Sequence, residues 1–140
     1  MIHMVKLCVG VASVEELESF RDQRAHWWDA DYGDDVHVHR TRMMPKRAAE
    51  MEGKSSIYWV IAGAIVCRQV IERLQPYTDA EGKDYCDIIM SPNLIRTVPY
   101  PKRPFQGWRY LEPKDAPPDI ADNDDNSSEI AAELARLGLL

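Results

Sequence analysis

The sequence predicts an α+β domain built on a small, partly open antiparallel β-barrel with helices at its two ends. Three observations support this fold class. At least five short segments are rich in β-branched and aromatic residues, helical periodicity is confined to the chain ends, and the middle connections are short. Short connections favour antiparallel pairing, and closing the sheet removes exposed strand edges.

The N-terminal region predicts a strand followed by a helix. Apolar and other residues alternate over residues 5–9, which is typical of a strand. Ser13 and Glu16 have the spacing of a capping box, the pattern that begins a helix. Apolar residues at helical spacing then predict a helix over Val14–Trp28. Asp29–Asp35 holds four aspartates and one glycine without periodicity, so we expect a loop there.

The middle of the chain predicts most of the sheet. Val36–Met44 alternates as a strand, and a short helix over Lys46–Glu52 begins after the proline that ends this strand. Three further segments predict an antiparallel meander: 56–62, 65–74 and 84–90.

The meander is bounded by turn residues, and the C-terminal third is rich in proline. Gly63 ends the first of its strands, and Asp79–Lys83 predicts a hairpin turn. Seven prolines between Pro92 and Pro118 predict extended, irregular chain, with a short strand near Trp108–Leu111. A polar linker over 121–128 then precedes a last helix.

Length and composition predict one domain over residues 1–140. The apolar share of 45% is sufficient for a core, and no apolar run approaches the length of a membrane span. The N-terminus lacks the pattern of a secretion signal. The three cysteines, Cys8, Cys67 and Cys86, form no Cys-x-x-Cys pair, and we expect them to be buried thiols. A cytoplasmic location follows as an expectation.

Charge is distributed unevenly along the chain. Residues 36–111 carry 12 Lys and Arg against 7 Asp and Glu, whereas residues 1–35 and 112–140 carry net charges of −5 and −6. A basic middle between acidic ends predicts an anion-binding surface. The structural alternative is that these cations only solvate strand edges.

Several motifs resemble those of a known family. They are His-Val-His-Arg-Thr-Arg-Met-Met-Pro-Lys-Arg at 37–47, Ser-Ile-Tyr-Trp-Val-Ile-Ala-Gly at 56–63, Arg-Pro-Phe-Gln-Gly-Trp-Arg-Tyr-Leu at 103–111 and Asp-Ala-Pro-Pro-Asp at 115–119. Over roughly residues 3–139 the chain resembles an uncharacterised bacterial family, found mostly in alphaproteobacteria, that is classed as a domain of unknown function. This resemblance implies no particular activity.

A looser likeness concerns the order of the elements. A strand with basic residues, a short helix and a meander led by a Tyr/Trp strand resemble the PUA barrels of pseudouridine synthases and archaeosine transglycosylases, and their ASCH and EVE relatives. That resemblance implies binding of RNA or of modified bases. The Gly-x-Lys-x-x-Thr/Glu-x-Arg motif of the ASCH group is absent, so no catalytic lysine is carried over.

The residues themselves favour a nucleic-acid interface. Arginines near aromatic rings are suited to unpaired RNA, because guanidiniums hold phosphates and rings stack on bases. We therefore predict that RNA or a modified nucleoside contacts the following residues: Arg40, Arg42, Lys46, Arg47, Arg68, Arg103, Gln106, Trp108, Arg109 and Tyr110.

Two other functions remain open at this point. A hydrolase of a modified nucleoside or an amide would use Thr41, Lys46 and an acidic partner such as Glu72. A protein-interaction module would use the acidic terminal helices and Trp27 with Trp28.

No cofactor and no metal are predicted. His37 and His39 share one face of a strand and could form half of a metal site. A third ligand would have to come from a distant segment, so we expect one of the two rings to be packed and the other exposed.

Overall fold

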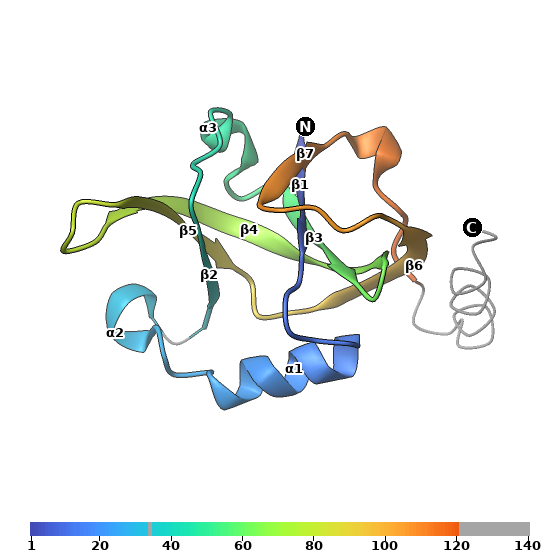
Figure 1. Cartoon of the computed structure of the whole chain (residues 1–140), viewed down its shortest axis with the longest axis horizontal. Coiled ribbons are helices and arrows are strands. Elements are labelled where there is room, and N and C mark those ends of the chain that lie inside the picture. The colour runs from blue at the N-terminus through green and yellow to red at the C-terminus, as the bar shows by residue number, and fades with distance from the viewer. Residues whose placement is uncertain (34, 121–140) are drawn as a thin grey trace.

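The computed structural model describes residues 1–33 and 35–120. In Figure 1, α1 and α2 lie along one end of the sheet and α3 and the turn η1 along the other, while Met51 of α3 packs into the same core cluster as Val14 and Leu17 of α1. The predicted linker and last helix fall outside the described residues. In chain order the elements are β1 His3–Leu7, α1 Val14–Gln23, α2 Asp29–Tyr32, β2 His37–Thr41, α3 Ala48–Met51, β3 Ser56–Ile61, β4 Ala64–Thr78, β5 Asp84–Met90, β6 Ile95–Pro101, β7 Trp108–Leu111 and η1 Pro113–Asp115.

The seven strands form one sheet that does not close into a barrel. Their order is β2-β5-β4-β3-β1-β7, and β6 pairs with β4 beyond the end of β5. The predicted meander β3–β4–β5 is antiparallel, as expected. The prediction of a wholly antiparallel sheet is wrong in one place, because β1 runs parallel to β3. Only the long excursion through α1, β2 and α3 allows these two strands to point the same way.

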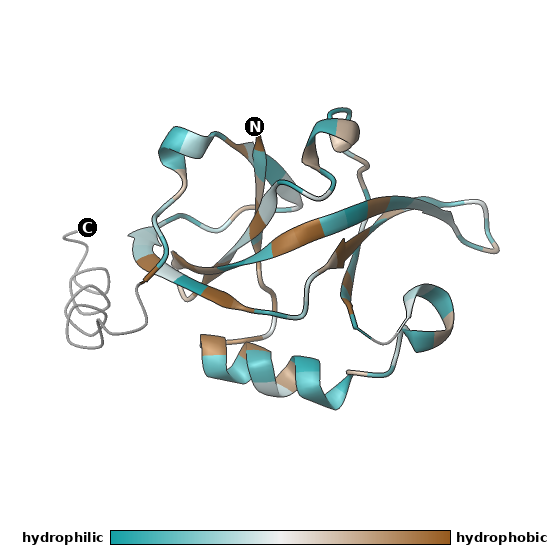
Figure 2. Cartoon of the chain, turned by 180° about the vertical axis from the view of Figure 1, so that it is seen from behind, coloured by the Kyte–Doolittle hydropathy of each residue, from teal (hydrophilic) through white to brown (hydrophobic). Residues whose placement is uncertain are grey.

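Local chemistry explains the tight turn between β3 and β4. Ala62 and Gly63 both have positive φ, 51° and 83°. Two such residues in succession form the hairpin turn whose twist matches that of the flanking strands. This confirms Gly63 as the end of the β3 segment. The hydrophilic tip of the other hairpin, between β4 and β5, contrasts with the hydrophobic residues in the middle of β4 (Figure 2).

Strand β6 contradicts the irregular chain that the prolines predict. Pro99 and Pro101 lie within it, while Arg96 and Tyr100 pair with Cys67 and Ile65 of β4. Prolines are tolerated in a strand at a sheet edge, where the missing N–H is not needed by a neighbour. The predicted strand at Trp108–Leu111 is present as β7.

Helix α1 begins as predicted and ends early. The backbone N–H of Glu16 donates to Ser13 Oγ at 3.0 Å, and Glu16 Oε2 accepts from Ala12 N at 3.3 Å. Ser13 therefore caps the helix as predicted, whereas Glu16 accepts from the residue before Ser13 and not from Ser13 itself, so the predicted capping box is formed in part. The helix ends at Gln23 rather than Trp28, because the N–H groups that follow bond to carbonyls three residues back, including Trp27 N to Arg24 O at 3.1 Å.

Helix α2 occupies part of the predicted loop, and a distant carboxylate holds it. Tyr32 Oη donates to Asp87 Oδ2 at 2.6 Å, and Asp87 on β5 is 0% exposed. Arg40 donates to both oxygens of Asp87, at 2.6 and 2.8 Å. The Arg40 guanidinium also lies over the Tyr77 ring, 3.7 Å from its centroid. A partner 55 residues away in sequence is invisible to local patterns.

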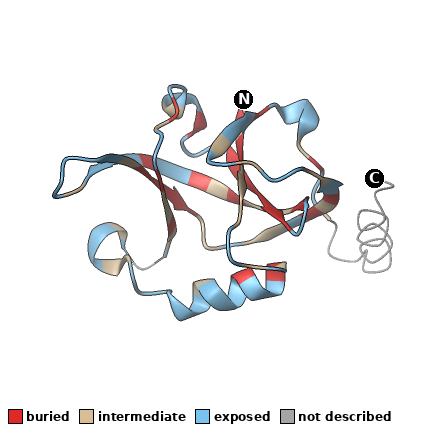
Figure 3. Ribbon diagram, in the orientation of Figure 1, coloured by how far each residue is buried: buried red, intermediate tan, exposed pale blue. Residues whose placement is uncertain are grey.

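The core lies on both faces of the sheet. The larger cluster includes Met4, Trp59 and Ile88 and is covered by the first turns of α1, the only buried part of that helix (Figure 3). The smaller cluster includes Tyr58 and Leu111 on the other face. Strand β3 is buried throughout, as its apolar sequence predicts. Within the described residues, no helix has the length and apolar character needed to cross a bilayer.

Replacing Arg40 tests the anchoring of α2. We expect Arg40→Met to lower the free energy of unfolding by about 3 kcal/mol, because it leaves a fully buried carboxylate without its cation. Urea unfolding measures this change. Arg47→Met is the matched control, since the Arg47–Glu50 pair is exposed on both sides and its loss should change stability far less. Equal effects of the two substitutions would contradict a structural role for Arg40.

Candidate functional site

One cavity lies near the place where the sheet fails to close. It has a volume of about 320 Å³ and is formed by α1, the loop that follows α1, β1 and β2. Strands β2 and β7 are the two ends of the sheet order. They are linked by side chains instead of a strand ladder: Trp108 Nε1 donates to Met43 O at 2.7 Å, and Arg47 N donates to Tyr110 Oη at 3.2 Å. We call this cavity the cleft.

The side chains that line the cleft are cations, rings and aliphatic groups. The cations are Lys6, Arg21, Arg24 and Arg40. The rings are Phe20, Trp27, Trp28, Trp59, His37 and His39. Among the described residues, no lining side chain carries an oxygen atom. The cleft therefore offers positive charge and N–H donors, together with flat apolar surfaces, and its side chains offer no carboxylate.

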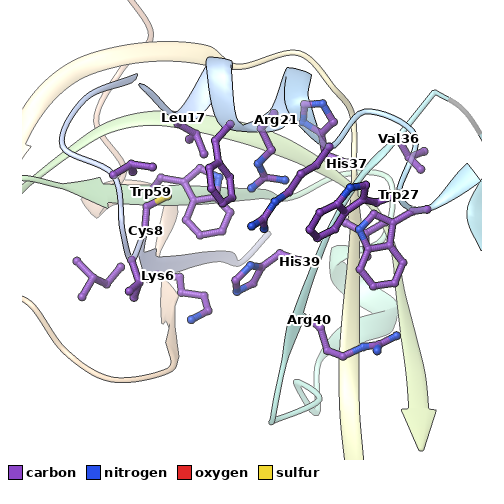
Figure 4. A pocket seen from close by; sticks show the side chains of 17 residues that line it. Lys6, Cys8, Leu17, Arg21, Trp27, Val36, His37, His39, Arg40 and Trp59 are labelled. Atoms are coloured by element: carbon purple, nitrogen blue, oxygen red, sulfur yellow. The ribbon is translucent and has the colours of Figure 1, made fainter. Parts of the chain in front are cut away.

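Lys6 and Arg21 are the cations of the interior. Figure 4 shows both around the same hollow as Trp59 and His39. The Arg21 guanidinium lies 5.6 Å from the centre of the Trp59 ring. Neither cation forms an ion pair with a carboxylate in the part of the chain that the structure describes. Burial lowers the pKa of both groups, which are thus held in an environment that disfavours their charge.

Arg24 occupies a slot between two rings. Its guanidinium lies 3.7 Å from the centre of the Phe20 ring and 4.2 Å from that of Trp27. Trp27 is 63% exposed, so this stack stands at the solvent side of the cleft. Guanidinium groups stack on aromatic faces in the same way as planar bases do. Phe20 and Trp27 can accordingly hold one flat group between them.

A buried amide organises the inner wall of the cleft. Gln69 on β4 is fully buried, and its Oε1 accepts from Trp59 Nε1 at 3.0 Å. Its Nε2 lies 2.9 Å from Ser91 O and 3.1 Å from His37 Nδ1. One amide thus positions both a tryptophan and a histidine of the cleft, on strands that are not neighbours in the sheet.

Both histidines of β2 line the cleft and are neutral at physiological pH, and His37 also lines a second hollow with Glu18, Asp22 and Asn93. His37 and His39 alternate with Val38, and the His39 ring meets Trp59 edge-on at 5.4 Å between centroids. Burial, followed by nearby cations, lowers the pKa of each to about 4. In the described residues no group of three or more His, Cys, Asp or Glu side chains is arranged to hold a metal ion.

Of the residues that the sequence predicts for binding, only Arg40 lines the cleft. Figure 4 shows its side chain directed away from the hollow, in accord with its bonds to Asp87. Arg68 likewise donates to both oxygens of Asp119, at 2.8 Å each, and to Ser56 Oγ at 2.7 Å. These two arginines hold the fold together.

The two basic segments of the prediction do lie side by side. The bonds of Trp108 to Met43 and of Tyr110 to Arg47 join residues 40–47 to 103–110. Trp108 also pairs across the strands with Lys6 of the cleft. The Trp108 and Tyr110 rings therefore continue the lining of the cleft along β7, with their centroids 4.9 Å apart.

The remaining predicted residues lie outside the cleft. Arg42 lies over Tyr85, 5.1 Å from the ring centre. Arg109 alternates with Trp108 and Tyr110 on β7, so it faces the other side, where it lies over Phe105 at 4.6 Å. The other three are exposed or at the surface: Lys46, Arg103 and Gln106.

Sequence reasoning missed the cations of α1 and β1. Residues 1–35 carry a net charge of −5, and this sum hides Lys6, Arg21 and Arg24. A usable signal was present, because Phe20, Arg24 and Trp27 recur at helical spacing and thus share one face. The net charge of a segment sums over all of its residues, whereas only the residues on one face of the segment line the cleft.

Acid should weaken the fold through the two histidines. In the unfolded chain the two histidines take up protons near their ordinary pKa of 6.5. In the folded chain they take up protons only near pH 4. The free energy of unfolding should therefore fall as the pH drops through this window. Urea unfolding at several pH values, followed by circular dichroism, measures the slope.

Two histidine variants isolate this effect from the titration of the carboxylates. His39→Phe should flatten the slope relative to the unsubstituted chain. His26→Phe is the control, because it removes a histidine that lies outside the cleft, with a side chain that is 85% exposed and bonded to Asp29. A slope unchanged by His39→Phe would contradict the burial of a neutral ring.

The unpaired cation of α1 should cost stability. We expect Arg21→Met to raise the free energy of unfolding by about 1 kcal/mol, because a partly buried charge without a carboxylate is replaced by an apolar side chain of similar length. Thermal and urea unfolding measure the change. Arg68→Met is the contrasting variant and should be destabilising, since Arg68 is bonded to Asp119 and Ser56. Loss of stability in Arg21→Met would show that Arg21 serves the fold.

Comparison with known proteins adds a family. No curated protein and no solved structure matches the chain. A family model described as "Protein of unknown function (DUF1489)" matches residues 4–140. This match covers nearly the whole chain, including every element that forms the cleft. The chain belongs to the DUF1489 family.

Proposed function

We propose that the cleft binds an unpaired nucleotide of RNA. The observation that carries this proposal is the lining itself: among the described residues it consists of cations, aromatic rings and aliphatic groups with no side-chain oxygen, in a chain whose net charge is −6. An acidic protein that keeps unpaired cations around one cavity is suited to an anion. The rings add the stacking surface that nucleobases use.

The dimensions of the cleft agree with this ligand. A volume of about 320 Å³ lies at the lower end of the range for small-molecule pockets and suits a single nucleotide. The base would lie among the rings, and its phosphate would meet the Lys6 ammonium and the Arg21 guanidinium. Unpaired RNA presents bases in this way, with their faces free.

A longer RNA has a path beyond the cleft. Lys6 stands opposite Trp108 across the β1–β7 pair, and Tyr110 follows on the same face of β7. Exposed Lys46 and Arg42 lie in the segment joined to these rings. We propose that the neighbouring nucleotides follow this strip. The likeness in element order to PUA, ASCH and EVE barrels agrees with such a ligand.

The other two candidate functions have no specific observation in their favour. Within the described residues, the proposed hydrolase groups Thr41, Lys46 and Glu72 do not line the cleft. Of the two tryptophans proposed for protein contact, Trp27 is exposed and Trp28 is half-buried against Tyr32 and Arg40.

Replacing the interior cations tests the proposal. We expect the double variant Lys6→Met/Arg21→Met to bind a fluorescein-labelled, mixed-sequence single-stranded RNA 12-mer more than about tenfold more weakly, a loss of roughly 1.4 kcal/mol. The slope of log affinity against log salt should also fall by about 0.7 for each cation that contacts a phosphate. Fluorescence anisotropy at low salt and at a salt series measures both.

The control removes the same charge elsewhere. Arg103→Met/Arg109→Met eliminates two cations outside the cleft and should leave the affinity nearly unchanged. A larger loss in this control would place the interface on residues 103–110 and overturn the cleft as the binding site. If the unsubstituted chain binds no single-stranded RNA at low salt, the function is wrong.

A further inference from the structure

The hydrogen bonds of Gln69 fix which way its amide faces. The indole N–H of Trp59 can only donate, so the atom 3.0 Å from it must be the amide oxygen. The carbonyl of Ser91 can only accept, so the atom 2.9 Å from it must be the amide nitrogen. Both neighbours agree on one orientation, and the flipped amide would place a donor against a donor and an acceptor against an acceptor.

The fixed amide in turn decides where the proton of His37 lies. Gln69 Nε2 donates to His37 Nδ1 at 3.1 Å, so Nδ1 carries the lone pair and the ring proton is on Nε2. Protonating Nδ1 would set two N–H groups against each other, and the lowered pKa of His37 accords with this. Nε2 lies on the far side of the ring from Gln69, and no described residue accepts its proton. His37 lines the cleft and also the adjoining hollow of Glu18, Arg21, Asp22 and Asn93, so its fixed N–H donor stands where the two meet.

We propose that His37 Nε2–H makes the cleft specific for the oxo edge of a base, as in uracil or a 6-oxopurine, against the amino edge of cytosine or adenine. This specificity rests on the proposed function. An oxo group accepts from this donor, whereas an exocyclic amine would face it without a partner. A ligand that leaves a buried donor without an acceptor binds more weakly, and this difference in affinity gives the specificity.

The rest of the lining strengthens this selection. The polar side-chain groups of the cleft in the described residues are ammonium, guanidinium, indole, imidazole and one thiol. The oxygen atoms that would accept from an amine are absent from these side chains. His39 offers one ring nitrogen of either kind, and its ring is turned edge-on to Trp59. Donors therefore predominate among the side chains of the cleft, while Glu18 and Asp22 line the adjoining hollow beyond His37.

Two matched ligand pairs test the selectivity. Inosine and adenosine 5′-monophosphates differ at position 6, and uridine and cytidine 5′-monophosphates differ at position 4. We expect the oxo member of at least one pair to bind about tenfold more tightly than its amino partner. Isothermal titration with the full chain measures the four affinities, and the pair that discriminates tells whether the site takes a purine or a pyrimidine.

The His37→Phe variant should abolish the preference, bringing the oxo ligand to the affinity of its amino partner. Equal binding of both members in both pairs, still lost in Lys6→Met/Arg21→Met, would overturn the oxo specificity and leave nucleotide binding intact. No binding of any of the four ligands, with no binding of the RNA 12-mer, would overturn both.

The fixed tautomer has a test that needs no ligand. ¹⁵N shifts of the His37 ring in the full chain should show the proton on Nε2 at neutral pH. Free histidine in the same buffer gives the reference for a ring in solvent. A His37 ring with its proton on Nδ1 would overturn the inference even if His37→Phe were too unstable to study.

Discussion

The open seam between β2 and β7 is the constraint on which the rest of this molecule depends. The two strands end the sheet, and only side-chain bonds from Trp108 and Tyr110 reach across to residues 43–47. A ladder at this place would have brought the backbones together and left no cavity. Because the seam stays open, the first turns of α1 pack over the inner face of the sheet, and the rest of the helix becomes a wall of the cleft.

The cations of the chain divide into two groups by their partners. Arg40 and Arg68 are each bonded to both oxygens of a carboxylate and hold distant segments together. Lys6 and Arg21 have no such partner among the described residues and stand around the cavity. A charge kept partly buried without compensation is unfavourable for folding, so a function is the natural reason for its presence. The presence of a carboxylate partner, more than solvent exposure, distinguishes the structural cations from the functional ones.

Local patterns predicted the α+β class, the meander, the helix cap at Ser13 and the strand at Trp108–Leu111. These patterns failed where residues that are distant in the sequence determine the local structure. Asp87 turns part of an aspartate-rich loop into α2, an edge position admits the prolines of β6, and β1 joins β3 in parallel. The same holds for the site. The sequence predicted that residues 40–47 and 103–110 lie side by side, but it did not predict that the cations of the cleft come from the acidic N-terminal segment. The topology of the sheet determines which side chains come together, and this cannot be read from the alternation of residues along one strand.

The placement of the tryptophans has a practical consequence. Trp27, Trp28 and Trp59 line the cleft, and Trp108 stands beside Lys6 on the adjoining strand. These four are the whole tryptophan content of the chain. Its tryptophan emission therefore originates at and around this one cavity, with Trp27 facing solvent and Trp59 enclosed. The protein carries a built-in optical probe of its own cleft, and occupancy can be followed without attaching a dye.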